Sequence, residues 1–269
     1  MFRRAPVLVS FLAAASRTND DSFWRKSSVE PSISQDFFSW DPNWDKRDPE
    51  ASFQSDKLYE QNRKHIDLAD NKTKKNSISR NLFFVRHGEY YTDGKDKKLT
   101  DLGRKQAKLC AERLFNLGFH FTRFVSSEKQ RAVETANIMS QFMKPDDEFQ
   151  YDSLLNEGCP VRPDPATSRN ARRRELYYYQ DGPRIEAAFR RYFYRPTTDQ
   201  TADSYEIFVC HANVIRYFVC RALQIQSSAW RRMSIANCSI TWIKISQSGR
   251  VNLRSLGDTG FMPANMITY

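Results

Sequence analysis

Two histidines, each close behind an apolar run, are the side chains of this sequence best suited to chemistry. His87 follows the letters LFFVR, and His211 follows the letters YEIFVC. A neutral imidazole can attack as a nucleophile, and its protonated form can donate hydrogen bonds to an anion. Arg86 precedes the first histidine, and Arg131 follows a third short run, RFV. A guanidinium group can hold phosphate or carboxylate oxygens with two parallel hydrogen bonds, so the combination indicates chemistry on an anionic group.

The apolar runs predict strands, and the segments between them predict helices. Short continuous runs at 82–85, 123–125 and 205–210 are typical of buried parallel strands. The first helix should begin with Thr100 as its N-cap and end near Gly118. This alternation predicts an α/β fold, a three-layer sandwich in which helices flank a mostly parallel central sheet. Because ligands bind beyond the carboxyl ends of such strands, the histidines and arginines should meet there.

Two more helices and a hairpin complete the expected fold. Apolar residues recur at helical spacing from Ala132 to Met143, and the letters VIRYFVCRAL, shortly after His211, predict another helix. The segments SITWIKI and RVNLRSL alternate in polarity around Ser248 and Gly249, which predicts a hairpin.

Each of these residues taken alone also has a purely structural interpretation. The other two histidines, His65 and His120, lie in a polar tail and a connector, where we expect them to be solvated or structural. The cysteines form no CxxC pair and their number is odd, so we expect reduced core residues rather than a disulfide framework. They are Cys110, Cys159, Cys210, Cys220 and Cys238.

The charge balance favours an anionic ligand without identifying it. The net charge is +10, and residues 81–269 hold 28 Lys and Arg against 20 Asp and Glu. A basic domain suits phosphate, a phosphoprotein, nucleic acid or an acidic membrane. No helix-turn-helix, zinc-finger or RNA-recognition pattern is present in the sequence, so we expect no nucleic-acid partner.

The order of the motifs carries more weight than any one of them. LFFVRHGE, LTDLGRKQA, SSEKQRAVETA, LLNEG and VCHANVIR follow one another along residues 81–269. In that order they resemble the histidine phosphatase superfamily, also called the phosphoglycerate mutase-like family. The resemblance implies the three-layer α/β fold of that family and phosphoryl transfer to a histidine.

The same resemblance implies a role for each residue. His87 would be the nucleophile, and Glu157 in LLNEG would protonate the leaving alcohol and then activate water. Arg86, Arg131 and His211 would bind the phosphate, with His211 also counted as catalytic. Neither a metal nor a cofactor is implied, because the cations neutralise the phosphate charge. Cations should pull the pKa of Glu157 down, so burial or local geometry must keep it able to donate a proton.

Two further features indicate which branch of this family the sequence resembles most. The spacing from RHGEYYTDG to LTDLG is short, as in the phosphatase branches rather than the sugar-phosphate mutases. The stretches WDPNWD, DGPRIEAAF and GDTGFMP resemble mitochondrial Ser/Thr-protein phosphatases of this family. That implies phosphoserine and phosphothreonine proteins as substrates, a mitochondrial membrane location, which we predict to be the outer membrane, and activation by self-assembly. A small-molecule phosphomonoesterase or mutase, and a phosphoprotein-binding scaffold without turnover, remain the alternatives.

Residues 1–20 are predicted to be a targeting or membrane-anchor segment. The segment has an arginine pair and an apolar stretch from Ala5 to Ala15, which is shorter than the ~20 residues that span a bilayer as a helix. A secretory signal, a mitochondrial targeting segment, a short anchor and a disordered terminus all fit this pattern. Free thiols argue against secretion.

Residues 21–80 read as a polar linker that carries a tryptophan motif at 39–49. Large aromatic side chains in a polar stretch are expected to pack against another surface that shields them from water. We predict that this surface belongs to another subunit, with packing on the chain's own domain as the alternative. The residues predicted to drive self-association are Trp40, Asp41, Pro42, Asn43, Trp44 and Asp45. A second surface feature, the basic run Arg169–Arg174, is either a solvated face or a docking strip for acidic phosphoprotein segments.

Overall fold

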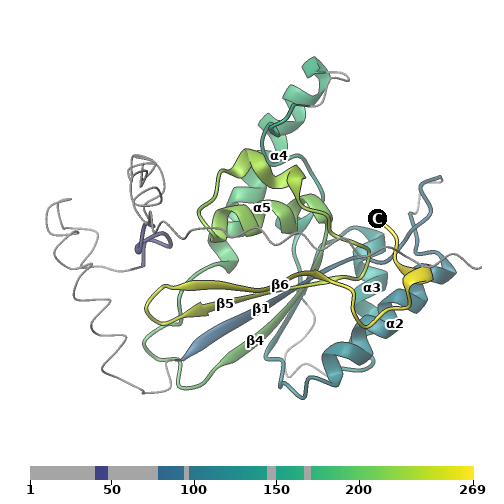
Figure 1. The fold of residues 1–269 in the computed structure, drawn as a ribbon, viewed down its shortest axis with the longest axis horizontal. Helices are drawn as coiled ribbons and strands as arrows, with labels where there is room; N and C mark the ends of the chain where they lie inside the picture. The colour runs from purple at the N-terminus through teal and green to yellow at the C-terminus, as the bar shows by residue number, and fades with distance from the viewer. Residues whose placement is uncertain (1–39, 48–77, 94–96, 144–149, 167–170) are drawn as a thin grey trace, which may run out of the picture. The chain divides into compact units, whose positions relative to one another are not determined.

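The computed structural model describes residues 40–47, 78–93, 97–143, 150–166 and 171–269, with the side chains of 171–174 left out. Residues 40–269 fold as one unit (Figure 1). The predicted segment 1–20 and His65 lie outside the described residues. Within the described ranges, no helix has the length and apolar character that a membrane crossing requires.

The described strands form one mixed sheet in the order β3-β2-β4-β1-β5-β6. The four strands β3, β2, β4 and β1 run parallel, and β5 and β6 add an antiparallel hairpin at one edge. This confirms the predicted α/β fold with a mostly parallel sheet. The strands are β1 (Ser79–Arg86), β2 (Arg123–Ser126), β3 (Gln150–Tyr151), β4 (Ser204–Cys210), β5 (Ile240–Ser246) and β6 (Val251–Asp258).

Helices cover both faces of this sheet, as Figure 1 shows. Alternate side chains of β1 point to opposite faces: Leu82 and Phe84 join one apolar cluster, and Phe83 and Val85 join another. The first cluster packs beneath α4 (Ala171–Tyr192) and α5 (Ala212–Ala222), and the second beneath α2 (Asp101–Phe115) and α3 (Gln130–Ser140). Single turns η3 (Ser153–Leu155) and η5 (Ala264–Met266) and the longer η4 (Ser227–Arg232) are 3₁₀ helices.

Several local predictions are confirmed. Thr100 caps α2, because its hydroxyl oxygen accepts a hydrogen bond from the backbone N–H of Gly103 at 3.0 Å. The chain turns at Gly118, whose φ of 69° lies in the left-handed region. The hairpin joins β5 and β6 around Gly249, which also has a positive φ. All the cysteines are free, and four of the five are buried.

The first strand begins earlier than its apolar letters indicate. β1 starts at Ser79, because Arg80 is buried and paired with Glu206 of β4. Its Nε and Nη2 donate to the two carboxylate oxygens at 2.8 and 2.7 Å, and its Nη1 donates to the carbonyls of Tyr192 and Tyr194. A buried charge is tolerated only with such partners, and these partners lie more than 100 residues away.

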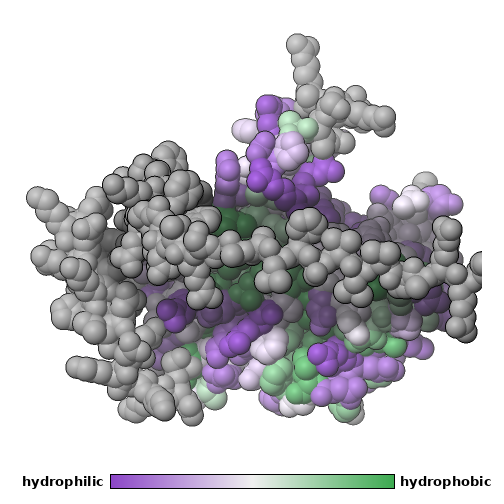
Figure 2. All heavy atoms as spheres, viewed as in Figure 1, coloured by the Kyte–Doolittle hydropathy of each residue, from purple (hydrophilic) through white to green (hydrophobic). Residues whose placement is uncertain are grey.

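The helix α4 is not predicted from the sequence, because Gly182 and Pro183 lie in its interior and both residues disfavour a helix. Tertiary packing explains the glycine: a Cβ atom there would lie 2.5 Å from the carbonyl oxygen of Pro160. The part of α4 that extends from the body is mostly hydrophilic on the face seen in Figure 2.

The loop after β1 lies directly against the start of α2. A Cβ atom on Gly103 would lie 2.0 Å from the carbonyl oxygen of Glu89, and one on Gly88 would lie 2.6 Å from the carbonyl oxygen of Gly103. The contact at Gly88 is with the backbone of α2, so a side chain at that position would force the loop and the helix apart. The two glycines therefore let α2 fix the loop that follows His87.

Gly103→Ala should destabilise the protein by ~1–3 kcal/mol, because the new methyl group must displace the backbone of the loop. Thermal unfolding should show the melting temperature fall by several degrees. Gly260→Ala is the matched control, since a Cβ atom at that exposed glycine would approach only the side chain of Asp258, at 3.2 Å. Equal melting temperatures for the two variants would contradict the close-packing argument.

Candidate active site

Neighbouring strands bring the predicted side chains to one edge of the sheet. His87 follows β1, His211 follows β4, and Arg131 lies in the first turn of α3, just after β2. The ring centroids of the two histidines are 5.0 Å apart, and Arg131 Nε lies 3.1 Å from His87 Nε2. Glu157 follows η3 and is close enough to Arg131 and Arg86 for their charges to act on its pKa.

The hydrogen bonds of His87 determine which of its ring nitrogens has a free electron pair. Nδ1 lies 2.9 Å from the carbonyl oxygen of Gly88, which can only accept, so Nδ1 carries the proton. Nε2 is then unprotonated and accepts a hydrogen bond from Arg131 Nε. Burial, followed by the charges of Arg131 and Arg86, holds the pKa of His87 well below its ordinary value. The ring is therefore neutral at pH 7.

His211 has the opposite arrangement. The hydroxyl of Ser127 donates to Asn156 Oδ1 at 2.7 Å, and the backbone N–H of Glu128 donates to the same oxygen. The Ser127 oxygen can then only accept from His211 Nε2, which lies 2.8 Å away and carries the proton. Nδ1 is buried, unprotonated and without a hydrogen-bond partner among the described residues. Burial is the main reason that the pKa of His211 is well below its ordinary value.

Two arginines also present unused donors. Arg86 donates from Nη1 to the carbonyl of Ile235 at 2.6 Å, but within the described part of the chain its buried Nε has no partner. The same is true of the Nε of Arg216 on α5. Arg216 is the last residue of the motif VCHANVIR, but no role was predicted for it from the sequence. Its position on the helix that begins just after His211 was the available signal, because that helix starts at the site.

Glu157 has a raised pKa although three guanidinium groups act on it. Burial is the largest cause, and it outweighs the lowering by the Gly158 N–H and by Arg131, Arg86 and Arg216. The expected downward pull of the cations is therefore present, but burial decides the direction. A protonated carboxyl group remains accessible nearer to neutral pH than it would in water.

Two further features of the sequence were His120 and a basic run. His120 is exposed on the connector before β2. The run Arg169–Arg174 lies outside the residues whose side chains are described.

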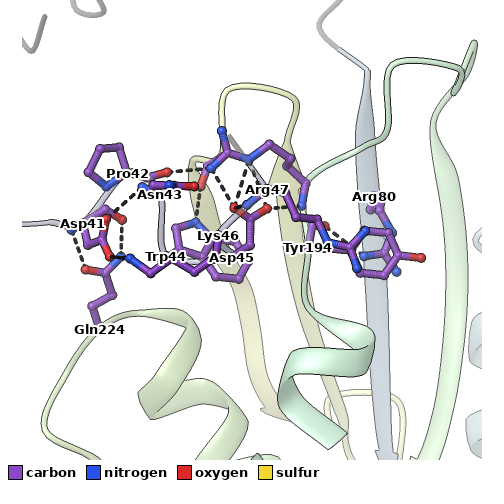
Figure 3. A network of polar contacts seen from close by, with 12 residues as sticks. Asp41, Pro42, Asn43, Trp44, Asp45, Lys46, Arg47, Arg80, Tyr194 and Gln224 are labelled. Atoms are coloured by element: carbon purple, nitrogen blue, oxygen red, sulfur yellow. Dashed lines mark hydrogen bonds and ion pairs between the residues drawn. The ribbon is translucent and has the colours of Figure 1, made fainter. Parts of the chain in front are cut away.

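The described part of the tryptophan motif, residues 40–47, packs on its own chain, as Figure 3 shows. Arg195 donates from Nε and Nη2 to the two carboxylate oxygens of Asp45 at 3.0 and 2.8 Å. Although burial alone would raise the pKa of Asp45, these bonds hold it below the ordinary value. Trp44 Nε1 donates to the carbonyl of Gly249 at 2.8 Å, and its ring lies 6.2 Å from that of Phe189. Within one chain, these contacts correspond to the alternative prediction, in which the segment packs on its own domain and not on another subunit.

Comparisons with known proteins agree with this geometry. Residues 82–259 match the profile of the histidine phosphatase superfamily (branch 1). The protein named serine/threonine-protein phosphatase PGAM5, mitochondrial, from Homo sapiens is 46% identical over 238 residues, which cover 85% of this chain and 80% of that protein. The relative of the same name from Caenorhabditis briggsae is 43% identical over 237 residues, covering 86% and 81%.

Solved structures share the fold. A phosphoglycerate mutase from Plasmodium falciparum is 34% identical, covers 71% of this chain and 99% of its own, and superimposes with a TM-score of 0.50. A structure titled mycobacterial hydrolase 2 reaches a TM-score of 0.52 at 19% identity, covering 70% of this chain and 94% of its own. At that identity the likeness concerns the fold alone.

Binding of a phosphate dianion should be coupled to the uptake of a proton. A dianion beside the unprotonated Nδ1 of His211 favours the imidazolium form, so the pKa of His211 should rise on binding. Calorimetric titration with inorganic phosphate at pH 7.5, in buffers of different ionisation enthalpy, should show net uptake approaching about one proton per site. Phosphate affinity should accordingly fall as the pH rises above 7.5, where most of the free phosphate is already a dianion.

Two variants identify the group that takes up the proton. His211→Gln should bind phosphate more weakly and without proton uptake, whereas Glu157→Gln should keep the uptake. A binding enthalpy of the unmodified protein that is independent of the buffer would contradict this account of His211.

Proposed function

The chain belongs to the histidine phosphatase superfamily (branch 1), and from that premise we propose that it hydrolyses phosphoserine and phosphothreonine in proteins through a phosphohistidine on His87. The observation that carries the proposal is the unprotonated Nε2 of His87, which lies beside Arg131 in a site that also holds an acid of raised pKa, Glu157. Relatives of 43–46% identity that match over most of their length are named serine/threonine-protein phosphatases.

Phosphate binding uses the groups that lack partners in the protein. The Nε–H groups of Arg86 and Arg216 can each donate to a peripheral phosphate oxygen, and protonated Nδ1 of His211 can donate to another. Arg131 is the one that changes partner, because its Nε–H turns from His87 Nε2 to the phosphate. That exchange frees the electron pair of the nucleophile at the moment of binding.

In the first chemical step the electron pair of His87 Nε2 forms a bond to phosphorus. The bond from phosphorus to the serine or threonine oxygen breaks, and Glu157 gives its proton to that oxygen. The imidazole ring gains positive charge, which the carbonyl of Gly88 stabilises through the hydrogen bond from Nδ1–H. The dephosphorylated protein leaves, and Glu157 remains as a carboxylate.

In the second step the Glu157 carboxylate takes a proton from a water molecule as the water oxygen attacks phosphorus. The bond between phosphorus and Nε2 breaks, and its electron pair returns to His87. Inorganic phosphate leaves, and Glu157 is again protonated for the next cycle. The arginines neutralise the phosphate oxygens throughout, so we propose that neither step needs a metal ion.

A second enzymatic function has one observation in its favour. The phosphoglycerate mutase from Plasmodium falciparum is 34% identical and shares the fold, which suits a small-molecule phosphatase or mutase. A scaffold without turnover is less well supported, because a binding protein has no need of an unprotonated histidine and a proton donor together. Parallel assays on phosphopeptides and sugar phosphates separate the two enzymatic functions.

We further propose a mitochondrial membrane location, at the outer membrane, with residues 1–20 as the attachment. The support is that the relatives carry mitochondrial names and that this segment has the arginines and apolar residues of a targeting or anchor sequence. Self-association would use Trp40–Asp45. The contacts of Trp44 and Asp45 with Phe189 and Arg195 can equally form between two copies, because exchange of a segment between identical chains reproduces them.

His87→Ala should abolish turnover of phosphopeptides, because loss of a covalent nucleophile removes several orders of magnitude in rate. The unmodified protein, quenched in alkali after brief exposure to a ³²P-labelled phosphopeptide, should carry acid-labile, alkali-stable phosphate that the variant lacks. Phosphopeptides should react faster than sugar phosphates. Near-normal turnover by His87→Ala would eliminate the mechanism, and a preference for sugar phosphates would favour the second function.

Replacing both Trp40 and Trp44 by Ala should give smaller particles in light scattering and a lower kcat on phosphopeptides. The reason is that the aromatic side chains would no longer join subunits, and separate subunits lose the contacts that order the active-site loops. A double variant of the full chain with the parent mass and rate but an earlier melting transition would limit the segment to the intrachain role.

A further inference from the structure

The loop that carries Glu157 depends on α4 for its shape. It follows η3, whose last carbonyl groups lack partners within so short a helix. Arg184 of α4 supplies them: Nη1 donates to the carbonyl oxygens of Leu154 at 2.9 Å and Asn156 at 2.7 Å, with a longer contact of 3.3 Å to Ser153. Its Nη2 donates to the carbonyl oxygen of Glu157 itself at 3.2 Å.

Asp181 completes the support from the same helix. One carboxylate oxygen accepts from the backbone N–H of Cys159 at 3.0 Å, and the other accepts from Arg184 Nη2 at 3.2 Å. The backbone of the loop at Gly158 packs directly against both side chains. A Cβ atom on Gly158 would lie 2.5 Å from Asp181 Cγ and 2.7 Å from Arg184 Nη2, so only a glycine fits there. The two side chains therefore hold the backbone on both sides of the Glu157 carboxyl group.

We propose that Arg184, with Asp181 as its partner, is a positioning residue that holds the carboxyl group of Glu157 at the leaving-group oxygen. The inference rests on the proposed acid role of Glu157. The helix is a rigid base for this task, because the residue after Arg184, Ile185, is fully buried in the core together with Ala188. Groups held by buried elements keep their geometry better than groups on a free loop.

Arg184 acts through geometry rather than through charge. The cations that act on the pKa of Glu157 are Arg131 of α3, Arg86 of β1 and Arg216 of α5. The guanidinium group of Arg184 is turned instead to Asp181 and to backbone carbonyls. Its loss should displace the carboxyl group and leave the phosphate-binding cations in place.

The leaving group distinguishes such displacement from general damage. A serine alkoxide needs a proton as it departs, and a misplaced acid can cost on the order of 100-fold in rate. A 4-nitrophenolate ion leaves without a proton. The quantity to compare is kcat/KM, because it reports the steps up to formation of the phosphoenzyme and excludes its later hydrolysis by water.

The experiment measures kcat/KM of the full chain on a phosphoserine peptide and on 4-nitrophenyl phosphate. Arg184→Ala should lose about 30-fold or more on the peptide and less than about threefold on the aryl ester. Arg184→Lys should recover part of the peptide activity, because an ammonium group can still reach some of the carbonyl oxygens. Arg190→Ala is the matched control on the same helix, since Arg190 is exposed and pairs only with Glu186 among the contacts that the structure gives it.

Glu157→Gln is the reference that separates two kinds of failure. If it loses activity on the peptide but not on the aryl ester while Arg184→Ala reduces both equally, the positioning role is wrong and the acid role stands. If Glu157→Gln itself reduces both equally, the proposed acid role fails first.

A second variant covers the case in which Arg184→Ala does not fold. Gly158→Ala should push the loop away from Asp181 and Arg184 and produce the same selective loss on the peptide. Circular dichroism and thermal melting establish that each variant is folded before its rates are compared. A folded Gly158→Ala with unchanged selectivity between the two esters would overturn the proposal.

Discussion

The hydrogen bond from His87 Nδ1 to the carbonyl of Gly88 is the constraint on which the proposed chemistry depends. It places the only ring proton on Nδ1 and leaves an electron pair on Nε2. The carbonyl can face the ring because the Gly88 N–H donates to Thr135 Oγ1 at 3.0 Å and because Gly103 lets α2 approach without a side chain in the way. Gly88 thus connects the end of β1 to α3 through its hydrogen bond with Thr135 and to α2 through its close contact with Gly103.

Burial explains why this site is poised for an anion. Burial lowers the pKa of both histidines and raises the pKa of Glu157, so it favours the neutral form of all three groups. When Glu157 is protonated, its carboxyl group no longer balances the positive charges of Arg86, Arg131 and Arg216. The charges of Arg86 and Arg131 raise the cost of protonating the histidines, and all three guanidinium groups would favour a bound phosphate dianion. The same low-polarity surroundings would strengthen each hydrogen bond to such a phosphate.

The proposed acid and the second histidine are connected through one residue. Asn156 Oδ1 accepts the hydroxyl proton of Ser127, which in turn orients His211, while the backbone carbonyl of Asn156 is held by Arg184. A shift of the loop would therefore move both Glu157, the proposed acid, and Ser127, which orients His211. This shared anchor gives a physical reason for the loop to be tied so firmly to α4.

The sequence by itself determined the local features. The apolar runs, the Thr100 cap, the turn at Gly249 and the order of the motifs come from residues close together in the chain, where spacing and side-chain type suffice. The fold class and the meeting of His87 with His211 follow, because parallel strands end at one edge of a sheet.

Only the tertiary structure decided the features that depend on distant contacts and on burial. The early start of β1 needs Glu206 to cover Arg80, the helix through Gly182 and Pro183 needs the packing around Pro160, and the cover of Trp44 needs Phe189. The direction of the Glu157 pKa shift could not be read from the letters, since nearby cations and burial oppose each other and burial is a property of the folded chain. The tautomers of the two histidines likewise required the positions of Gly88 and Ser127, which the fold alone supplies.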